Sequence, residues 1–581
     1  MTTFTVWAPE AKSVAVAIGK ARIPMTSGEG GWWSADVPSA GPGTEYAFVL
    51  DGSEPLPDPR SPWQPHGVHG PSRVVDHQAF LWTDTHWQAP PLSAAVIYEL
   101  HVGTFTPAGT FEAVSERLEH LIDLGVTHLE LMPVNAFSGT RGWGYDGVDL
   151  YAPHHAYGGP EGLKRLVNAC HSHGLAVLLD VVYNHLGPTG NYLSRFGPYF
   201  TGHYSTPWGQ AVNLDGPGSD EVRRFFCDNA LMWLRDYHFD GLRIDAVHAI
   251  VDTSAVHFLE QLAAEVKELE AQRGRHLVLI AESDLNDPRL VRSPEVGGYG
   301  MHAQWSDDFH HALHTVLTGE CDGYYTGFGT FADLAKAIER VFVYDGRYSV
   351  FRRRRHGRLP IGLSGHRFLG YLQNHDQIGN RAQGERSSQL MNTGRLKVAA
   401  ALVCTAAFIP LLFQGEEWGA SSPFLYFTDH EDPELGQAVS KGRREEFAAF
   451  GWDPEEVPDP QSPETFARSR LDWNEREREP HASLLEWHRR LIRLRRQVPE
   501  LADGRLDKVQ VRFDERAQWL AVERGAITVA CNLAPQIQRI PVSGTLPGHI
   551  LLASEPVVGT TPDWVELPPD SVAIVGPAES L

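Results

Sequence analysis

The middle of the chain alternates between short apolar runs and longer segments in which apolar residues recur at helical spacing. This alternation predicts βα units around a parallel sheet, and eight such units close into a barrel. The runs predicted to be the barrel strands are Val96–Leu100, Thr127–Met132, Leu175–Val182, Gly241–Asp245, His276–Ala281, His302–Trp305, Arg367–Leu372 and Ile409–Gln414. The last barrel helix is predicted at His481–Val498 and ends before Pro499. We therefore expect an α/β fold with a (β/α)8 TIM barrel over about residues 91–502.

Both ends of the chain carry short strand-like runs separated by turn residues instead. The runs predicted to be strands are Phe4–Trp7, Val14–Ile18, Gly31–Val37 and Tyr46–Leu50 at the N-terminus, and Val509–Phe513, Trp519–Val522, Ile527–Ala530 and Ser571–Val575 at the C-terminus. They predict an immunoglobulin-like β-sandwich over 1–90 and a C-terminal β-sheet domain over 503–581. The proline-rich stretch 55–65 is expected to be an extended connection.

Composition and charge narrow the possible partners. No run approaches the roughly 18 apolar residues of a membrane span, and the first residues lack the apolar core of a secretion signal, so we expect a cytoplasmic protein. The net charge of −23 disfavours nucleic acid and anionic membranes, but it is compatible with a neutral glucan. Arg352–Arg355 is interpreted as a solvated or salt-bridged face. The five cysteines are scattered, which predicts reduced thiols.

Four short stretches place polar residues at the ends of predicted strands. They are Asp180–His185, Gly241–His248, Ile280–Ser283 and Gln373–Gln377. Parallel barrel strands deliver their C-terminal ends to one face, and acids collected there cost desolvation energy, so their presence indicates chemistry. Cleavage of a glycosidic bond with retention requires two carboxyl groups about 5 Å apart, one ionised and one protonated. The sequence therefore predicts a glycosidase.

The three candidate acids differ in their surroundings. Asp245 is predicted to be the nucleophile, because Arg243 on the same strand face keeps its carboxylate ionised. Glu282 is predicted to be the general acid, because the apolar run before it raises its pKa by desolvation. Asp376 is left to hold the substrate and to stabilise oxocarbenium charge.

Other polar residues near these strand ends have simpler interpretations. A single aspartate at a strand end is more often a helix cap or an ion-pair partner, and Asp180 is interpreted in that way, as an anchor for Arg243. The pair His310 and His314 lies one helical turn apart but lacks a nearby cysteine or acid motif, so no metal site is predicted. The role of Glu416 and Glu417 after the eighth strand stays open.

The four stretches resemble the signature regions of the α-amylase superfamily of glycoside hydrolases. The resemblance implies that Asp245, Glu282 and Asp376 are the nucleophile, the acid and the stabilising carboxylate, in agreement with the interpretation above. It also implies that Tyr145, His185, Arg243 and His375 bind substrate; the imidazoles are suited to sugar hydroxyls and the tyrosine ring to a sugar face.

Longer strings resemble the maltooligosyltrehalose trehalohydrolases within that superfamily: Tyr98–Thr106, Ala281–Asp287, Gln304–His311, His375–Asn380 and Phe424–His430. This resemblance implies hydrolysis of the α-1,4 bond next to the terminal trehalose of a maltooligosyl trehalose, which releases trehalose. It implies further substrate contacts from His248, Asp307, Asp308, Gln377 and Asn380. It also implies a place in trehalose biosynthesis beside a maltooligosyltrehalose synthase.

Three expectations remain open at this point. The segment 186–218 after the third strand is short for the calcium-binding excursion of many amylases, so no metal or other cofactor is expected. Trehalose is expected to be distinguished from maltose by polar contacts in the leaving-group subsites, which we assign to Trp305–Phe309 and Phe424–His430. The alternatives are a branching transglycosylase with the same carboxylates and a non-catalytic glucan-binding protein.

Overall fold

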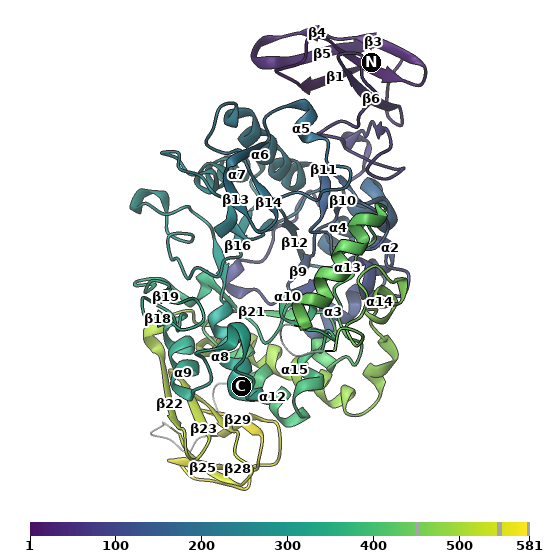
Figure 1. Ribbon diagram of the computed structural model, residues 1–581. Coiled ribbons are helices and arrows are strands. Elements are labelled where there is room, and N and C mark those ends of the chain that lie inside the picture. The colour runs from purple at the N-terminus through teal and green to yellow at the C-terminus, as the bar shows by residue number, and fades with distance from the viewer. Residues whose placement is uncertain (449–452, 543–548, 578–581) are drawn as a thin grey trace.

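The computed structural model describes residues 1–448, 453–542 and 549–577. Figure 1 shows three parts stacked along the molecule, with the N-terminal β-sandwich at one end, the barrel in the middle and the C-terminal β domain at the other end. This is the predicted α/β fold class. The exact domain divisions at about residues 90 and 502 stay a prediction. No helix among the described residues is long and apolar enough to cross a bilayer.

The barrel is a closed ring of eight parallel strands in the order β12-β15-β16-β17-β20-β21-β8-β9. Their bounds are β8 Ile97–Leu100, β9 His128–Leu131, β12 Ala176–Val181, β15 Gly241–Ile244, β16 Val278–Ala281, β17 Ala303–Trp305, β20 Phe368–Gly370 and β21 Ile409–Phe413. Every predicted barrel strand is confirmed, although each is slightly shorter than its apolar run. Both faces of each strand are buried, which explains why the runs are continuously apolar rather than alternating.

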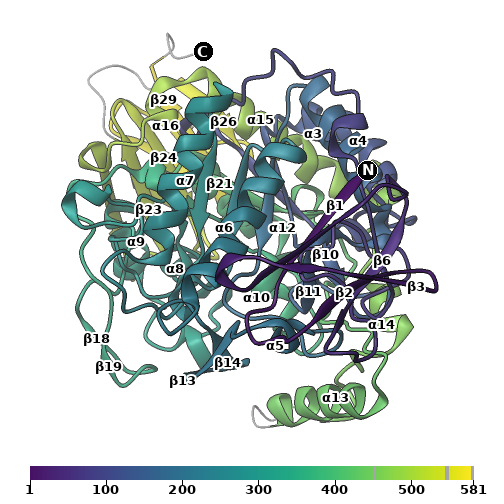
Figure 2. The same ribbon diagram turned by 90° about the horizontal axis from the view of Figure 1, so that it is seen from above.

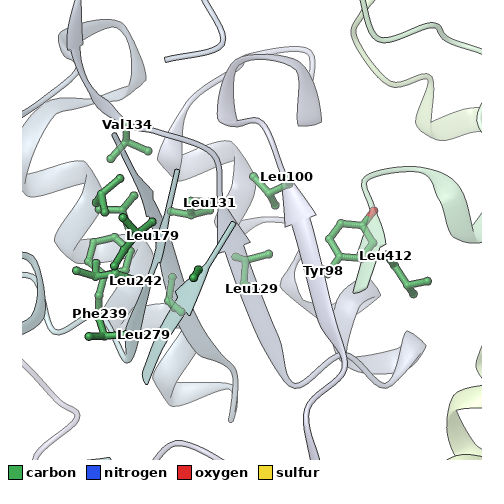
Figure 3. Close-up of a cluster of buried hydrophobic side chains, with 14 of the residues drawn as sticks. Tyr98, Leu100, Leu129, Leu131, Val134, Leu179, Phe239, Leu242, Leu279 and Leu412 are labelled. Carbon is green, nitrogen blue, oxygen red and sulfur yellow. The ribbon is translucent and has the colours of Figure 1, made fainter. Parts of the chain in front are cut away.

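Helices surround the ring and bury the outer face of the strands. Leu129, Leu179, Leu242 and Leu279 stand on neighbouring strands and are almost fully buried beneath the helices, as Figure 3 shows. The helices of the barrel region are α1 Val102–Phe105, α2 Phe111–Ser115, α3 Leu118–Leu124, α4 Gly159–Ser172, α5 Leu193–Phe196, α6 Ser219–Asp236, α7 Phe258–Arg273, α8 Asp307–Thr318, α9 Phe331–Arg340, α10 His375–Gly379, α11 Ser387–Leu390, α12 Thr393–Thr405, α13 Pro433–Ala448, α14 Pro463–Arg468 and α15 His481–Gln497. The predicted last helix is α15, and Pro499 begins the short helix α16 Pro499–Ala502.

The N-terminal part contains two sheets, of order β1-β5-β4 and β3-β2-β6-β7. Their strands are β1 Thr2–Trp7, β2 Val14–Ile18, β3 Ala21–Pro24, β4 Thr26–Ser27, β5 Trp32–Val37, β6 Glu45–Leu50 and β7 Ser72–Arg73. Figure 2 looks along the stack from the end that carries this sandwich, which therefore lies in front of the barrel. The four predicted strands are confirmed. The sequence missed β3 and β4, whose side chains are mostly exposed and carry no apolar alternation, and β7, which is only two residues long.

The C-terminal part contains the antiparallel sheets β22-β23-β24-β29-β26 and β25-β28-β27. Their strands are β22 Val509–Asp514, β23 Trp519–Arg524, β24 Ile527–Asn532, β25 Gln538–Pro541, β26 His549–Ala553, β27 Gly559–Thr560, β28 Trp564–Leu567 and β29 Ser571–Gly576. The four predicted strands are confirmed here as well. The remaining four are short or partly exposed, and the spacing of apolar residues did not reveal them.

Three short antiparallel strand pairs lie in the loops at the C-terminal side of the barrel strands. They are β10 Asn135–Phe137 with β11 Gly147–Pro153, β13 Phe200–Thr206 with β14 Gly209–Val212, and β18 Tyr348–Ser349 with β19 Arg354–Arg355. The second pair lies in the short segment 186–218, and its turn carries Trp208. Arg352 within the basic run pairs with Asp284 at 2.8 Å, as expected for a salt-bridged face.

A buried charge cluster joins the connection before the barrel to the N-terminal ends of the strands. Asp84 Oδ2 lies 2.8 Å from His171 Nδ1 and 2.8 Å from His238 Nδ1, and it accepts a hydrogen bond from Arg275. His171 also contacts Asp240 through Nε2 at 3.0 Å. Although burial opposes the charged form, these three donors hold the pKa of Asp84 below its usual range. Against the same burial, Asp240 and Asp84 raise the pKa of His171.

Replacing Asp84 with asparagine is expected to lower the free energy of unfolding by about 3–5 kcal/mol, because Arg275 and His171 lose a buried counter-charge. The lowered pKa of Asp84 gives stability above its unfolded value of about 4, and this stability is lost as pH falls. The raised pKa of His171 gives stability below about 6.5, and this is lost as pH rises. The difference in the free energy of unfolding between Asp84→Asn and the unmodified protein should therefore be largest between about pH 4 and 6.5. Denaturant unfolding at pH 5.5 and 8.0 measures it.

The control for this change is Asp123→Asn, on the exposed face of α3. This variant should unfold like the unmodified protein at both pH values. An Asp84→Asn variant that is equally destabilised at pH 5.5 and 8.0 would contradict the charge argument and leave only a packing effect.

Candidate active site

One buried guanidinium organises the candidate acids at the C-terminal ends of the strands. Arg243 on β15 is fully buried, and its Nη1 donates to Asp245 Oδ1 at 2.7 Å. Its Nη2 lies 3.7 Å from Glu282 Oε2. The backbone N–H of Ala246 also donates to Glu282 Oε2, at 2.6 Å. Asp245 follows β15 and Glu282 follows β16, so two neighbouring parallel strands bring both carboxyl groups to one cation.

Asp180 anchors that guanidinium from the next strand of the ring. Arg243 Nη1 donates to Asp180 Oδ1 at 2.9 Å and to Oδ2 at 2.8 Å. Asp180 and Arg243 are register partners in the parallel pair β12 and β15, which explains why the contact forms. The guanidinium also lies over the ring of Trp305, 4.4 Å from its centroid. The predicted structural role of Asp180 is thus confirmed.

The environment of Glu282 favours its protonated form. Burial raises its pKa well above the usual range, and the like charges of Asp245, Asp307 and Asp376 raise it further, while Arg243 opposes them. Its side chain still keeps 13 % of its surface exposed, towards a cleft. The group is therefore a partly accessible carboxyl whose surroundings favour the protonated form.

A second group of side chains lies beside the first. Tyr145 donates its hydroxyl proton to Asp180 Oδ2 at 2.6 Å, and its oxygen lies 2.8 Å from His375 Nε2. The rings of Tyr145 and His375 are stacked, with centroids 5.1 Å apart. His375 Nε2 is also 3.5 Å from Asp376 Oδ1, and the Asp376 side chain is 44 % exposed.

The short helix α10 carries Asp376 in its first turn. Asn374 caps it by accepting hydrogen bonds from the backbone N–H groups of Asp376 and Gln377, and the Gln377 side chain accepts from the Asn374 N–H. This reciprocal capping box satisfies the free donors at the helix start. The capping box thereby fixes the start of α10, from which Asp376 reaches the cleft that Asp245 and Glu282 also line.

These groups border a cleft of about 470 Å³. Seven of the predicted site residues line it: Tyr145, His185, Asp245, His248, Glu282, Asp376 and Asn380. The cleft wall also includes Trp143, Trp208 and residues 426–430. A cleft of this kind, with aromatic rings, polar groups and acids, fits a chain of sugar rings.

Five predicted site residues do not line the cleft. Arg243 and His375 are buried behind it, and the Gln377 side chain is engaged in the capping box. Asp307 is partly exposed and accepts a hydrogen bond from Tyr371 at 2.5 Å. Asp308 is enclosed: its Oδ2 accepts from Asn286 Nδ2 at 2.9 Å and from the Tyr344 N–H at 2.7 Å. The structure therefore brings Asp307 near the acids and turns Asp308 towards the loop 343–345.

Trp208 and Arg141 were missed by the sequence reasoning. Trp208 is 48 % exposed and stacks on His185, with centroids 4.7 Å apart and an interplanar angle of 7°. Arg141 pairs with Asp429 at 2.5 Å across the cleft wall. The turn residues Pro207 and Gly209 could have indicated a hairpin, but no local pattern shows that this hairpin folds back over His185.

The histidine pair and the two glutamates considered in the sequence are engaged elsewhere. His310 contacts Tyr325 and the Leu372 carbonyl, and His314 contacts Glu320. Glu417 is fully buried and accepts from Tyr98, while Glu416 is also buried. Within residues 1–448, 453–542 and 549–577, no group of three or more His, Cys, Asp or Glu residues is arranged to hold a metal ion.

Comparison with known proteins places this site in a family. The α-amylase catalytic domain family matches residues 78–198, the carbohydrate-binding module 48 (isoamylase N-terminal domain) matches 1–64, and a domain of unknown function, DUF3459, matches 504–574. The malto-oligosyltrehalose trehalohydrolase of Arthrobacter ramosus is 53 % identical over 94 % of this chain and 95 % of its own length. That of Mycobacterium tuberculosis is 49 % identical over the whole of both chains.

The chain belongs to the malto-oligosyltrehalose trehalohydrolase family. A crystal structure described as a putative α-amylase from Salmonella typhimurium is 39 % identical, with a TM-score of 0.91 over 99 % of this chain and 97 % of that one. A pullulanase from Paenibacillus barengoltzii shares the fold at 19 % identity, with a TM-score of 0.73. A 1,4-α-glucan branching enzyme from Pseudoalteromonas atlantica is 31 % identical, but over only 54 % of this chain. The trehalohydrolase family is thus supported over the full length, whereas the similarity to the branching enzyme is partial.

Proposed function

We propose that this chain hydrolyses, with retention, the α-1,4-glucosidic bond next to the terminal trehalose of a maltooligosyl trehalose. The observation that carries the chemistry is the pair Asp245 and Glu282 around the Arg243 guanidinium, which donates to Asp245 at 2.7 Å, while burial raises the pKa of Glu282 well above its usual range. The substrate follows from the trehalohydrolase relatives that match the full chain.

The reaction divides into two displacements. In the first, Asp245 attacks the anomeric carbon while Glu282 gives its proton to the glycosidic oxygen, so that trehalose leaves and a glycosyl-enzyme ester forms. In the second, Glu282 takes a proton from water, whose oxygen attacks the same carbon and releases Asp245. Glu282 ends protonated again, and the glucan ends as a free maltooligosaccharide.

The other residues around the cleft are proposed to bind and orient the sugar next to the bond that is cleaved. Asp376 is proposed to bind its hydroxyls and to stabilise the oxocarbenium charge, since its exposed carboxylate lines the same cleft as the two acids. Tyr145 supplies a ring for the sugar face and His185 a hydrogen bond to a hydroxyl. Arg243 holds the charge of Asp245, and His375 acts beside Asp376. His248, Gln377 and Asn380 are proposed to contribute contacts around the leaving group or the helix that carries Asp376.

The products and partners follow from the same chemistry. Trehalose and a shortened maltooligosaccharide leave the cleft, and the substrate has to come from an enzyme that converts the reducing end of a maltooligosaccharide into trehalose. We propose that a maltooligosyltrehalose synthase supplies it in trehalose biosynthesis, in the cytoplasm, without nucleic acid or membrane as a partner.

The decisive experiment compares two substrates. Purified protein is incubated separately with maltotriosyl trehalose and with maltopentaose, and both free trehalose and new reducing ends are quantified. We expect rapid trehalose release from the first and little attack on the second. Equal cleavage of both would overturn the trehalose preference. Longer, branched products would favour the transglycosylase alternative, in which the intermediate is shielded from water.

The leaving-group segments can be tested with a matched pair of neighbouring aspartates. Asp307→Asn is expected to reduce the preference for maltotriosyl trehalose over maltopentaose by about tenfold, since a polar contact to the second glucose is worth about 1–1.5 kcal/mol. Asp308→Asn removes a carboxylate that faces Asn286 and Tyr344 instead. It should lower the unfolding temperature and leave the preference unchanged. A loss of preference in the Asp308 variant alone would contradict this assignment.

A further inference from the structure

Two buried glutamates lie side by side on neighbouring barrel strands, close to the candidate site. Glu99 on β8 and Glu130 on β9 are register partners in neighbouring parallel strands, and each is only 1 % exposed. Their contacts differ completely. Neither carboxyl oxygen of Glu130 has a hydrogen-bond partner among the described residues, and burial raises its pKa well above the usual range. The surroundings of Glu130 therefore favour its neutral form, whereas Glu99 has specific partners.

Both oxygens of Glu99 contact His375. Its Oε1 lies within hydrogen-bond distance of His375 Nδ1, and its Oε2 accepts a hydrogen bond from the His375 backbone N–H at 3.2 Å. One carboxylate thus holds both the ring and the backbone of the residue directly before Asp376. This fixes the orientation of the imidazole and the start of α10 together.

The hydrogen bonds around Tyr145 indicate the protonation state of the His375 imidazole. Tyr145 has one hydroxyl proton and donates it to Asp180, which also accepts two hydrogen bonds from Arg243. The Tyr145 oxygen can then only accept from His375 Nε2–H, at 2.8 Å. With Glu99 and Asp180 as carboxylates, His375 Nδ1 donates to Glu99 as well, so both ring nitrogens carry protons and His375 is an imidazolium.

The titratable groups that face His375 come from four barrel strands, the helix α10 and two loops. They are Glu99 on β8, Glu130 on β9, Asp180 on β12, Arg243 on β15, Asp376 on α10 and, from loops, Tyr145 and His101. Burial disfavours a charged imidazole, but Glu99 and Asp376 outweigh it and raise the pKa of His375 to about 9, against the opposing charge of Arg243. This direction agrees with the proton count, which rests on the hydrogen-bond geometry with Glu99 and Asp180 as carboxylates.

We propose that Glu99 is a positioning residue of this site: it keeps His375 doubly protonated and oriented, and His375 in turn holds Tyr145 and Asp376 in place for the sugar. The proposal deepens the proposed function and rests on it for its kinetic consequence. A neutral His375 has one ring proton only. If Nδ1 keeps it, Nε2 becomes an acceptor, and the Tyr145 proton turns away from Asp180.

The first test measures the ring directly and requires no substrate. Histidine is labelled with ¹⁵N in both ring nitrogens, and the His375 signals are assigned with a His375→Gln variant. In the unmodified protein both nitrogens should keep imidazolium shifts at pH 8. In Glu99→Gln the ring should become neutral well below pH 8, close to the ordinary histidine pKa of about 6.5.

The second test measures kcat/KM on maltotriosyl trehalose at pH 5.5 and pH 8 for Glu99→Gln and for the unmodified protein. The value for the variant is divided by that for the unmodified protein at each pH. At pH 8 a histidine with the ordinary pKa keeps only about 3 % of its charged form, so the ratio should fall roughly 30-fold between the two pH values. The titration of Glu282 is common to both proteins and cancels in the ratio. A purely structural role for Glu99 would lower the ratio equally at both pH values.

The matched control is Glu130→Gln, which changes the same residue type at the register partner without touching His375. It should leave both the His375 titration and the kinetic ratio unchanged. If Glu99→Gln does not fold, Glu99→Asp keeps the negative charge, and it should restore imidazolium shifts at pH 8. A His375 ring that is neutral at pH 8 in the unmodified protein overturns the proposal, as does an equal effect of both glutamine variants. Imidazolium shifts in a protein that fails to release trehalose would overturn only the proposed function.

Discussion

Asp245→Asn is expected to abolish trehalose release, with kcat reduced by about 10⁴-fold or more, which corresponds to about 5 kcal/mol of transition-state stabilisation. The asparagine carbonyl can still accept the hydrogen bond that Arg243 Nη1 donates to Asp245 at 2.7 Å. The site therefore keeps its shape and loses only the charged oxygen that attacks the anomeric carbon. The glycosyl-enzyme ester cannot form, and the substrate can only bind.

Single-turnover assays with maltotriosyl trehalose measure this loss, and calorimetric titration of the same substrate checks that binding survives. The control is Asp287→Asn, five residues beyond Glu282, where the carboxylate pairs with Arg289 near the surface. This control should retain full activity. A turnover in Asp245→Asn within about tenfold of the unmodified protein would remove Asp245 from the nucleophile role and favour a non-catalytic protein.

The barrel could be predicted from the sequence because burial on both strand faces requires continuous apolar runs. Those runs gave all eight strands, and the parallel geometry then gave the common face for Asp245, Glu282 and Asp376. The strands that escaped prediction, such as β3 and β27, lie at exposed edges where packing does not constrain the residue type. Periodicity reports burial, so an element without a buried face leaves no periodic signal.

The finer geometry of the site depends on contacts between distant segments. Nothing local distinguishes Asp307 from Asp308, yet the first bonds Tyr371 near the acids and the second bonds Asn286 and the Tyr344 backbone away from them. The direction of each side chain depends on how α8 is seated on the barrel. The contact of Glu99 with His375 joins residues 276 positions apart, which explains why the sequence indicated the histidine and not its partner.

Glu282→Gln is expected to lose about 10³–10⁴-fold in kcat/KM on maltotriosyl trehalose, because general acid catalysis of a poor leaving group is lost. Glutamine keeps a carbonyl oxygen for the Ala246 N–H, which donates to Glu282 Oε2 at 2.6 Å, so the loop geometry should persist. The raised pKa of Glu282 means that the unmodified protein loses its active, protonated form as pH rises through that pKa. The variant has no proton to lose there, and its residual kcat/KM should be flat up to about pH 8, below the pKa of about 9 at which His375 loses its own proton.

A substrate whose leaving group needs no proton separates this role from that of Asp245. With α-maltotriosyl fluoride, Glu282→Gln should release a rapid burst of fluoride equal to the enzyme concentration, followed by slow turnover, since water then lacks its general base. Asp245→Asn should give no burst, because it cannot form the ester. Fluoride electrode traces in the first seconds after mixing show the difference. A burst in the Asp245 variant, or none in the Glu282 variant, would require the two roles to be exchanged or reassigned, since each displacement uses one carboxyl group as nucleophile and the other as proton carrier.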